Sequence, residues 1–216
     1  RTITPAQWRV LVAAKLGWML DAMDFLLYVM VIGRLKDYFQ FDDAMAGLLG
    51  TITLLVSATG GLFFGFIADR FGRARTLIVT ILVFSLCSLG AATSQTLTQL
   101  VLWRALLGLG MGGEWASGAV LVSETWPAQH RTKAIGIMQS GWALGYILAA
   151  IVAAVFLDVL SLGPEAWRWL FAFGAVPALL TLWIRRRIPE PAIWIERRHD
   201  ATPHSNPFLA LFSPEL

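Results

Sequence analysis

Six long apolar stretches separated by short polar segments run through the sequence. A helix needs roughly 20 mostly apolar residues to cross the hydrocarbon core of a bilayer. In lipid, a single spanning segment must be helical because its backbone groups find no water to bond. The pattern therefore predicts six membrane-spanning helices, at residues 10–32, 44–66, 76–94, 97–122, 134–157 and 167–184.

Composition supports a membrane protein. Of 216 residues, 57% are hydrophobic and only 14% are charged, which is unlike a soluble domain. The single cysteine, Cys87, lies inside an apolar stretch, and no histidine does, so we expect no metal site and no cofactor. The cations are spread over the ends of the apolar stretches instead of forming one polar face, which argues against nucleic-acid binding.

The distribution of cations predicts the orientation in the membrane. Six spans place both termini on one side, and the other side carries only Arg34, Lys36 and Arg168. The positive-inside rule makes the cation-rich side cytoplasmic. We therefore expect a multi-pass protein of the cell (inner) membrane with both termini in the cytoplasm. The cations on that side are Arg1, Arg9, Lys15, Arg70, Arg73, Arg75, Arg131, Lys133, Arg185, Arg186, Arg187, Arg197 and Arg198.

The polar segment between the second and third spans has a distinctive sequence. Gly65, Asp69, Arg70, Gly72 and Arg73 fit the pattern G-x-x-x-D-R-x-G-R, and a further cation follows two positions later. The two glycines permit close backbone approach and positive φ, and the aspartate is expected where the next helix begins. This segment resembles the signature loop of the major facilitator superfamily, although that signature has Lys or Arg directly after the last arginine.

The resemblance implies an all-α membrane protein whose six transmembrane helices form a 3+3 inverted repeat, half of a twelve-helix transporter. Residues 1–188 would form the six-helix half-bundle, and residues 189–216 a cytoplasmic amphipathic linker toward a second six-helix half. The expected partners are the lipid bilayer and that second half, from the same gene or a partner chain. A six-span unit that works as a homodimer is the alternative.

Four ionisable residues fall inside the predicted spans: Asp21, Asp24, Arg104 and Glu114. Each would cost about 2.5 to 3.5 kcal/mol at a helix centre, so they must face a cavity or one another. Asp21 and Asp24 share one helix face and could bind a proton, or one of them could pair with Arg104. Glu114 is turned about 80° from Arg104, and it either lines the same cavity or pairs with another helix.

Several residues are candidates for the lining of a substrate cavity. Gln139, Trp142 and Tyr146 share one face of the fifth span, and Tyr28 extends the polar face of the first. Packing between helices is the alternative role for this aromatic stripe. Alternating glycines in the fourth span, as well as Gly141 and Gly145 in the fifth, predict close helix crossings.

The resemblance also implies an ion-pair cluster at the cytoplasmic surface. Glu124 and Arg131 resemble the family's acidic and basic pair after the fourth span. Together with Asp69, Arg73 and Glu190 they would form a gate that breaks when the transporter opens inward. Solvated charges that contribute little are the alternative.

An Asp-x-x-Asp in the first span, an arginine followed by Gly-Gly-Glu in the fourth and no Gly-Pro antiporter signature are similar to the organic-acid proton symporters of this superfamily, which include the aromatic-acid and sialate groups. The resemblance implies proton-coupled uptake of a small organic acid, with its carboxylate attracted to Arg104 and the proton carried by Asp21 or Asp24. A sugar or polyol proton symporter, and a non-transporting half subunit or sensor, are the alternatives. An intramembrane enzyme is not expected, because Ser117 has no histidine in the spans to activate it.

Overall fold

The computed structural model describes residues 3–160 and 162–200, and in this part of the chain all regular structure is helical. Four of the helices are long: α1 (Pro5–Phe39), α2 (Asp43–Phe71), α3 (Arg73–Ala92) and α4 (Leu97–Thr125). The remaining elements are α5 (Ala128–Gln139), α6 (Gly141–Ala154) with a π-helical turn η1 (Val155–Val159), α7 (Ala166–Phe173), α8 (Pro177–Arg187) and α9 (Ala192–Asp200).

The predicted all-α membrane architecture is confirmed, with one difference in the last span. Five helical segments are long and apolar enough to cross a membrane, namely α1 to α4 and the rod Ala128–Val159 formed by α5, α6 and η1. The sixth apolar segment is shorter, at Ala166–Thr181, because the predicted span at 167–184 is split into α7 and α8.

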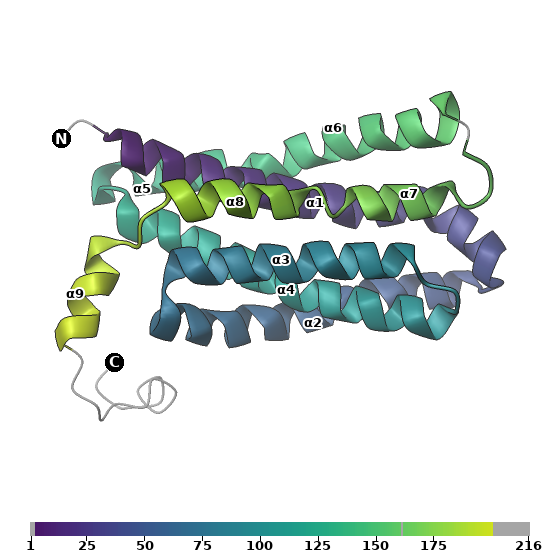
Figure 1. The fold of residues 1–216 in the computed structure, drawn as a ribbon, viewed down its shortest axis with the longest axis horizontal. Helices are drawn as coiled ribbons and strands as arrows, with labels where there is room; N and C mark the ends of the chain where they lie inside the picture. The colour runs from purple at the N-terminus through teal and green to yellow at the C-terminus, as the bar shows by residue number, and fades with distance from the viewer. Residues whose placement is uncertain (1–2, 161, 201–216) are drawn as a thin grey trace.

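The helices run side by side along the long axis of the bundle. Figure 1 shows α1, α6, α7 and α8 on one side and α2, α3 and α4 on the other. The N-terminus and the α2–α3, α4–α5 and α8–α9 connections lie at one end, which we call the motif end. The α1–α2, α3–α4 and α6–α7 connections lie at the opposite end, the far end.

Helix α4 packs against α2 with almost no side chain between the two backbones. A Cβ atom on Gly108 would overlap the backbone carbonyl of Thr53, and one on Gly112 would overlap that of Ser57. From the other side, a Cβ on Gly60 would overlap the backbone of Leu109. The close crossing predicted from the glycines of the fourth span is therefore confirmed.

The break in the last span has a local cause. Pro177 has no N–H for a helical hydrogen bond, and its ring would clash with the carbonyl four residues earlier. The chain instead tightens, and Ala175 and Val176 donate three residues back, to the carbonyls of Ala172 and Phe173, at 3.0 Å each. The sequence contains this signal, although the apolar pattern alone predicts one continuous helix.

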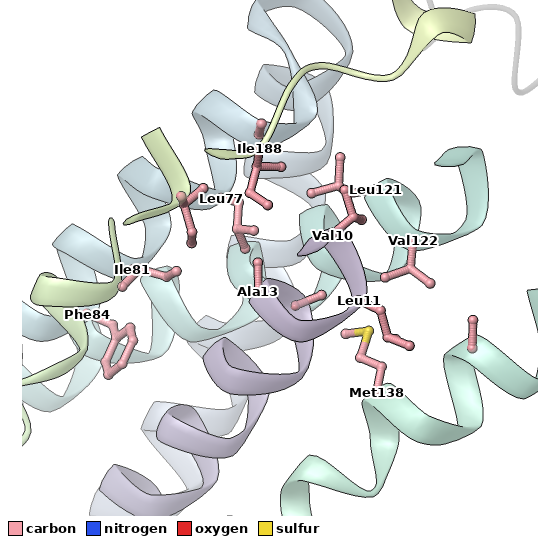
Figure 2. Packing of buried hydrophobic residues seen from close by; sticks show 14 of the residues in the cluster. Val10, Leu11, Ala13, Leu77, Ile81, Phe84, Leu121, Val122, Met138 and Ile188 are labelled. Atoms are coloured by element: carbon pink, nitrogen blue, oxygen red, sulfur yellow. The ribbon is translucent and has the colours of Figure 1, made fainter. Parts of the chain in front are cut away.

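Two apolar clusters fill the bundle. Figure 2 shows the one at the motif end, where Leu11 of α1, Leu77 of α3, Leu121 of α4 and Ile188 after α8 meet. The far-end cluster contains Leu27, Leu100, Trp167 and Phe171, among others. On α1, α3 and α4 the change from one cluster to the other coincides with buried polar residues, and on the last span it coincides with the break. The bundle therefore contains a polar layer between two apolar ones, with contributions from Asp21, Asp24, Ser88 and Arg104.

The division into a half-bundle at 1–188 and a linker at 189–216 stays a prediction. Helix α8 ends at Arg187, and α9 follows after a four-residue connection. Residues 201–216 of the predicted linker lie outside the described residues.

The glycine contacts predict a specific effect of Gly112→Ala. We expect a lower unfolding temperature in detergent, from a destabilisation of about 1 to 3 kcal/mol, because the added methyl group must push two backbones apart. Gly61→Ala is the matched control, since its nearest neighbour, the carbonyl of Gly112, would be 3.5 Å from the new Cβ. That variant should be neutral or more stable by up to about 1 kcal/mol. Equal unfolding temperatures for the two variants would contradict the close crossing.

Candidate functional site

The most deeply buried charge of the polar layer is Arg104. Its side chain is fully buried, and Nη1 lies 3.6 Å from Oδ2 of Asp24, which is also buried. The guanidinium lies over the ring of Tyr28, 4.4 Å from its centroid. None of its nitrogens has a hydrogen-bond partner among the described residues. Arg104 is therefore held by the charge of Asp24 and by an aromatic face.

Tyr28 is fixed in place from the opposite direction. Its hydroxyl donates to the backbone carbonyl of Ala46 on α2 at 2.8 Å, and its side chain is buried. The ring thus forms a wall of the Arg104 site. Tyr28 was predicted to line a cavity, but it is enclosed between its own helix α1 and the helices α2 and α4.

The other carboxylate oxygen of Asp24, Oδ1, is bound by a side chain of α3. The hydroxyl of Ser88 bonds to Oδ1 of Asp24, and the same hydroxyl lies 2.9 Å from the carbonyl oxygen of Phe171 on α7. Sequence reasoning missed Ser88. A buried serine in an apolar span is a weak signal, since such hydroxyls often bond within their own helix.

Asp21 and Glu114 form a second buried pair. Each is 2% exposed, and the Glu114 carboxylate lies against Gly17, one turn before Asp21 on the same face of α1. Neither oxygen of Asp21 has a hydrogen-bond partner among the described residues. Two ionised carboxylates side by side and away from water would repel each other, so this arrangement favours the binding of a proton. Glu114 of α4 thus lies against α1. The absence of a side chain at Gly17 provides the space, because a Cβ there would overlap the Glu114 carboxylate.

An aromatic groove is formed by residues of α1, α2, α4 and α6. Its volume is about 590 Å³, within the range of small-molecule pockets. Trp18 and Trp142 lie 4.9 Å apart between ring centroids, and Trp115 lies 6.4 Å from Trp18. No ionisable residue lines the groove within the described ranges. The lining residues are Trp18, Leu54, Ser57, Ala58, Gly61, Leu62, Met111, Gly112, Trp115, Ala116 and Trp142.

Only one of the predicted cavity residues lines this groove. Trp142 does so, whereas Gln139 and Tyr146 are exposed on the surface outside it. The groove follows Trp142 toward α1 and leaves the rest of the stripe outside. The contributions of Trp18 and Trp115 were missed, although each tryptophan is close in sequence to a buried carboxyl residue.

At the motif end, Arg73 is the centre of an ion-pair cluster. Its guanidinium makes a bidentate pair with Glu124 at 2.9 and 3.0 Å and pairs with Asp69 at 2.7 Å. It also donates to the carbonyl of Ala68 at 2.8 Å. Arg73 is 5% exposed and thus largely shielded from solvent, so these bonds join α2, α3 and α4 more firmly than an exposed pair would.

Glu190 has a different role from the one expected. Its carboxylate accepts the backbone N–H groups of Ala74 and Arg75 at 3.0 and 3.1 Å, so it caps the start of α3 from the α8–α9 connection. Gly72, with φ of 115°, leaves room for this carboxylate. Trp194 of α9 adds a bond from Nε1 to the carbonyl of Asp69 at 2.8 Å.

Three expectations for the signature segment and the pair after the fourth span need correction. Asp69 lies in the last turn of α2 and not at the start of α3, because the loop is only one residue long. A Cβ atom on Gly65 would meet nothing within 4 Å, and this glycine has no positive φ. Arg131, which was expected in the ion-pair cluster, is exposed and takes part in none of the ion pairs found among the described residues.

Residues 16–215 match the family model of the Major Facilitator Superfamily. The chain belongs to this superfamily. It is 39% identical over 203 residues to a probable 4-methylmuconolactone transporter of Cupriavidus pinatubonensis, covering 94% of this chain and 47% of that protein. It is 32% identical to the sialic acid transporter NanX of Escherichia coli, covering 98% of this chain and 50% of NanX.

The fold is also that of the superfamily. The crystal structure of a bacterial homolog of the human lysosomal transporter Spinster, inward-facing and unoccupied, matches with a TM-score of 0.79 at 23% identity, over 88% of this chain and 44% of that one. The chain spans about half the length of the curated relatives it matches.

The Asp24–Arg104 pair predicts non-additive effects on stability. At neutral pH, Arg104→Gln should lower the free energy of unfolding in detergent by about 3 to 5 kcal/mol, because it leaves a buried carboxylate without its cation. Asp24→Asn combined with Arg104→Gln should recover most of that loss. A double variant whose loss equals the sum of the two single losses would show that the pair has no energetic coupling.

The carboxyl pair predicts a spectroscopic signal. At neutral pH, infrared spectra should contain the carbonyl stretch of a protonated carboxylic acid, because Asp21 and Glu114 would repel each other at this depth if both were ionised. Glu114→Gln should abolish this band, since a glutamine amide can donate to an ionised Asp21 in its place. As the control, Asp24→Asn should keep the band. Spectra of the unmodified protein without the band would show that neither carboxyl group of this pair is protonated.

Proposed function

We propose that the chain is the amino-terminal half of a transporter that couples the uptake of a small organic anion to protons by alternating access. The observation that supports this most is the position of the polar layer, where two carboxyl-containing sites lie at mid-depth close to an aromatic groove. Intramembrane ionisable groups mark ion and substrate pathways by default.

The proton sites in this proposal are Asp24 and the Asp21–Glu114 pair. Asp24 can be neutralised either by Arg104 or by a proton, so protonation and the ion pair exclude each other. The carboxyl pair favours one bound proton, because its two charges would repel each other, and it could bind a second proton during transport. Arg104 keeps its charge throughout and so cannot carry the proton itself.

The aromatic groove is the substrate site in this proposal. Trp18, Trp115 and Trp142 offer flat faces that suit an unsaturated or aromatic ring. Arg104 is fully buried and does not line the groove, so we reassign it from the substrate carboxylate to Asp24. The cation that meets the carboxylate is then supplied by the second six-helix half, which would cover the open side of the groove.

The ion-pair cluster around Arg73 acts as the gate. Its bonds hold the motif end closed, and opening toward that end would separate Arg73 from Glu124 and release Glu190 from α3. The motif end carries Arg9, Arg75, Lys133 and other cations, whereas Arg34, Lys36 and Arg168 lie toward the far end. This asymmetry supports a cytoplasmic motif end in the inner membrane.

The test is uptake into proteoliposomes that contain this chain together with a carboxyl-terminal six-helix half. With an acidic exterior, we expect uptake of benzoate, sialic acid or 4-methylmuconolactone that a protonophore abolishes. Asp24→Asn should reduce it more than about tenfold, a loss of about 1.4 kcal/mol in the driving step.

Two outcomes would favour the alternatives. Proton-driven uptake of xylose without uptake of the acids would identify a sugar porter. Binding of the acids, measured by the quenching of tryptophan fluorescence, without any uptake would indicate a non-transporting subunit or sensor. Tyr146→Phe is a suitable control for uptake, since this side chain is exposed outside the groove.

A further inference from the structure

The break in the last span lies directly against the Asp24 site. A Cβ on Gly174, the first residue of the break, would overlap both the carboxylate of Asp24 and the hydroxyl of Ser88. The carbonyl oxygen of Phe171, in the last turn of α7, accepts the backbone N–H of Gly174 at 3.0 Å. The same oxygen lies 2.9 Å from Oγ of Ser88. A single hydroxyl group thus touches both the buried acid and the end of α7.

Ser88 has one hydrogen and two acceptors within hydrogen-bond distance. A hydroxyl group can donate one bond and accept two. Its acceptors here are Oδ1 of Asp24 and the carbonyl oxygen of Phe171. The side chain is 1% exposed, so bulk water does not reach it. The hydrogen can therefore serve only one of the two acceptors at a time.

We propose that Ser88 is a relay that transmits the protonation of Asp24 to the break between α7 and α8. When Asp24 is ionised, Ser88 donates to Oδ1, and Phe171 accepts only from Gly174. When Asp24 is protonated, its own O–H donates to Oγ of Ser88, and the Ser88 hydrogen turns to the Phe171 carbonyl. One proton is gained by Asp24, none is exchanged by Ser88, and the end of α7 gains a hydrogen bond.

The groups around Asp24 are compatible with this relay. The ionisable neighbours of Asp24 are Arg104 from α4, Asp21 from α1 and Cys87 from α3. From α7 and the break, the backbone of Phe171 and Gly174 faces the site, and the ring of Phe171 lies 6.0 Å from the Arg104 guanidinium. Arg104 lies on Oδ2, the other oxygen of Asp24, so it does not compete for the Ser88 hydroxyl.

The relay rests on the proposed proton binding by Asp24, but its test does not require transport. Backbone hydrogen exchange in the segment from Gly174 to Leu179 should be slower with Asp24 protonated, by about two- to tenfold in protection factor, the worth of one hydrogen bond. Protection factors corrected for intrinsic exchange should therefore fall as the pH is raised. The full chain in lipid nanodiscs is the sample.

Three variants make the measurement specific. Asp24→Asn offers an amide N–H to Ser88 at every pH, so the segment should stay protected throughout. Ser88→Ala removes the relay, so protection should be low and independent of pH. Ser85→Ala is the matched control, one turn earlier on the same helix, since its buried hydroxyl has no hydrogen-bond partner among the described residues. It should behave like the unmodified chain.

Some outcomes would overturn the relay. The first is a pH-dependent protection factor that survives in Ser88→Ala. The second is a loss of protection in Ser85→Ala as large as the loss in Ser88→Ala, which would show only a packing effect. A third is protection that follows Na⁺ concentration at constant pH, which would identify Asp24, Ser88 and Phe171 as a cation site. If exchange behaves as expected but uptake does not depend on protons, the proposed function fails and the relay stands.

Discussion

Burying ionised groups inside an apolar bundle is the constraint on which the rest of this structure depends. Asp24 and Asp21 of α1 each lie against a residue of α4, Asp24 as an ion pair with Arg104 and Asp21 beside the buried carboxyl group of Glu114. Two such contacts fix how α1 and α4 lie along each other. A charge without its partner at this depth would cost several kcal/mol, so neither helix can slide without separating both pairs.

Small residues make these contacts possible. The glycines of α4 let it approach α2 within backbone contact, and Gly145 of α6 would overlap the backbone of Met19 on α1 if it carried a side chain. Without such close crossings the helices would stand further apart, since side chains usually separate them by about 8 to 10 Å between axes. The same absence of a side chain at Gly17 and Gly174 provides the space for Glu114 and Asp24.

Hydropathy was sufficient to predict five of the spans and the place of the sixth, although not its break. Glycine spacing was sufficient to predict the close crossings. Both depend on local composition. The pairing of charges was not predictable in the same way. Asp21 and Asp24 share a helix face, yet they meet different residues of α4, and the choice depends on how the two helices are rotated. Glu190 was expected among cations and instead caps α3, a contact between residues more than a hundred positions apart.

Helix α8 connects the polar layer around Asp24 with the ion-pair cluster at the motif end. It starts at the break beside Asp24 and ends just before Ile188 and Glu190. Its 11 residues span about 16 Å. A rotation of about 10° at the break would displace the other end of α8 by about 3 Å, which is similar to the donor–acceptor distance of a hydrogen bond. A small change in angle at mid-depth is therefore large enough to pull the Glu190 carboxylate off the first turn of α3.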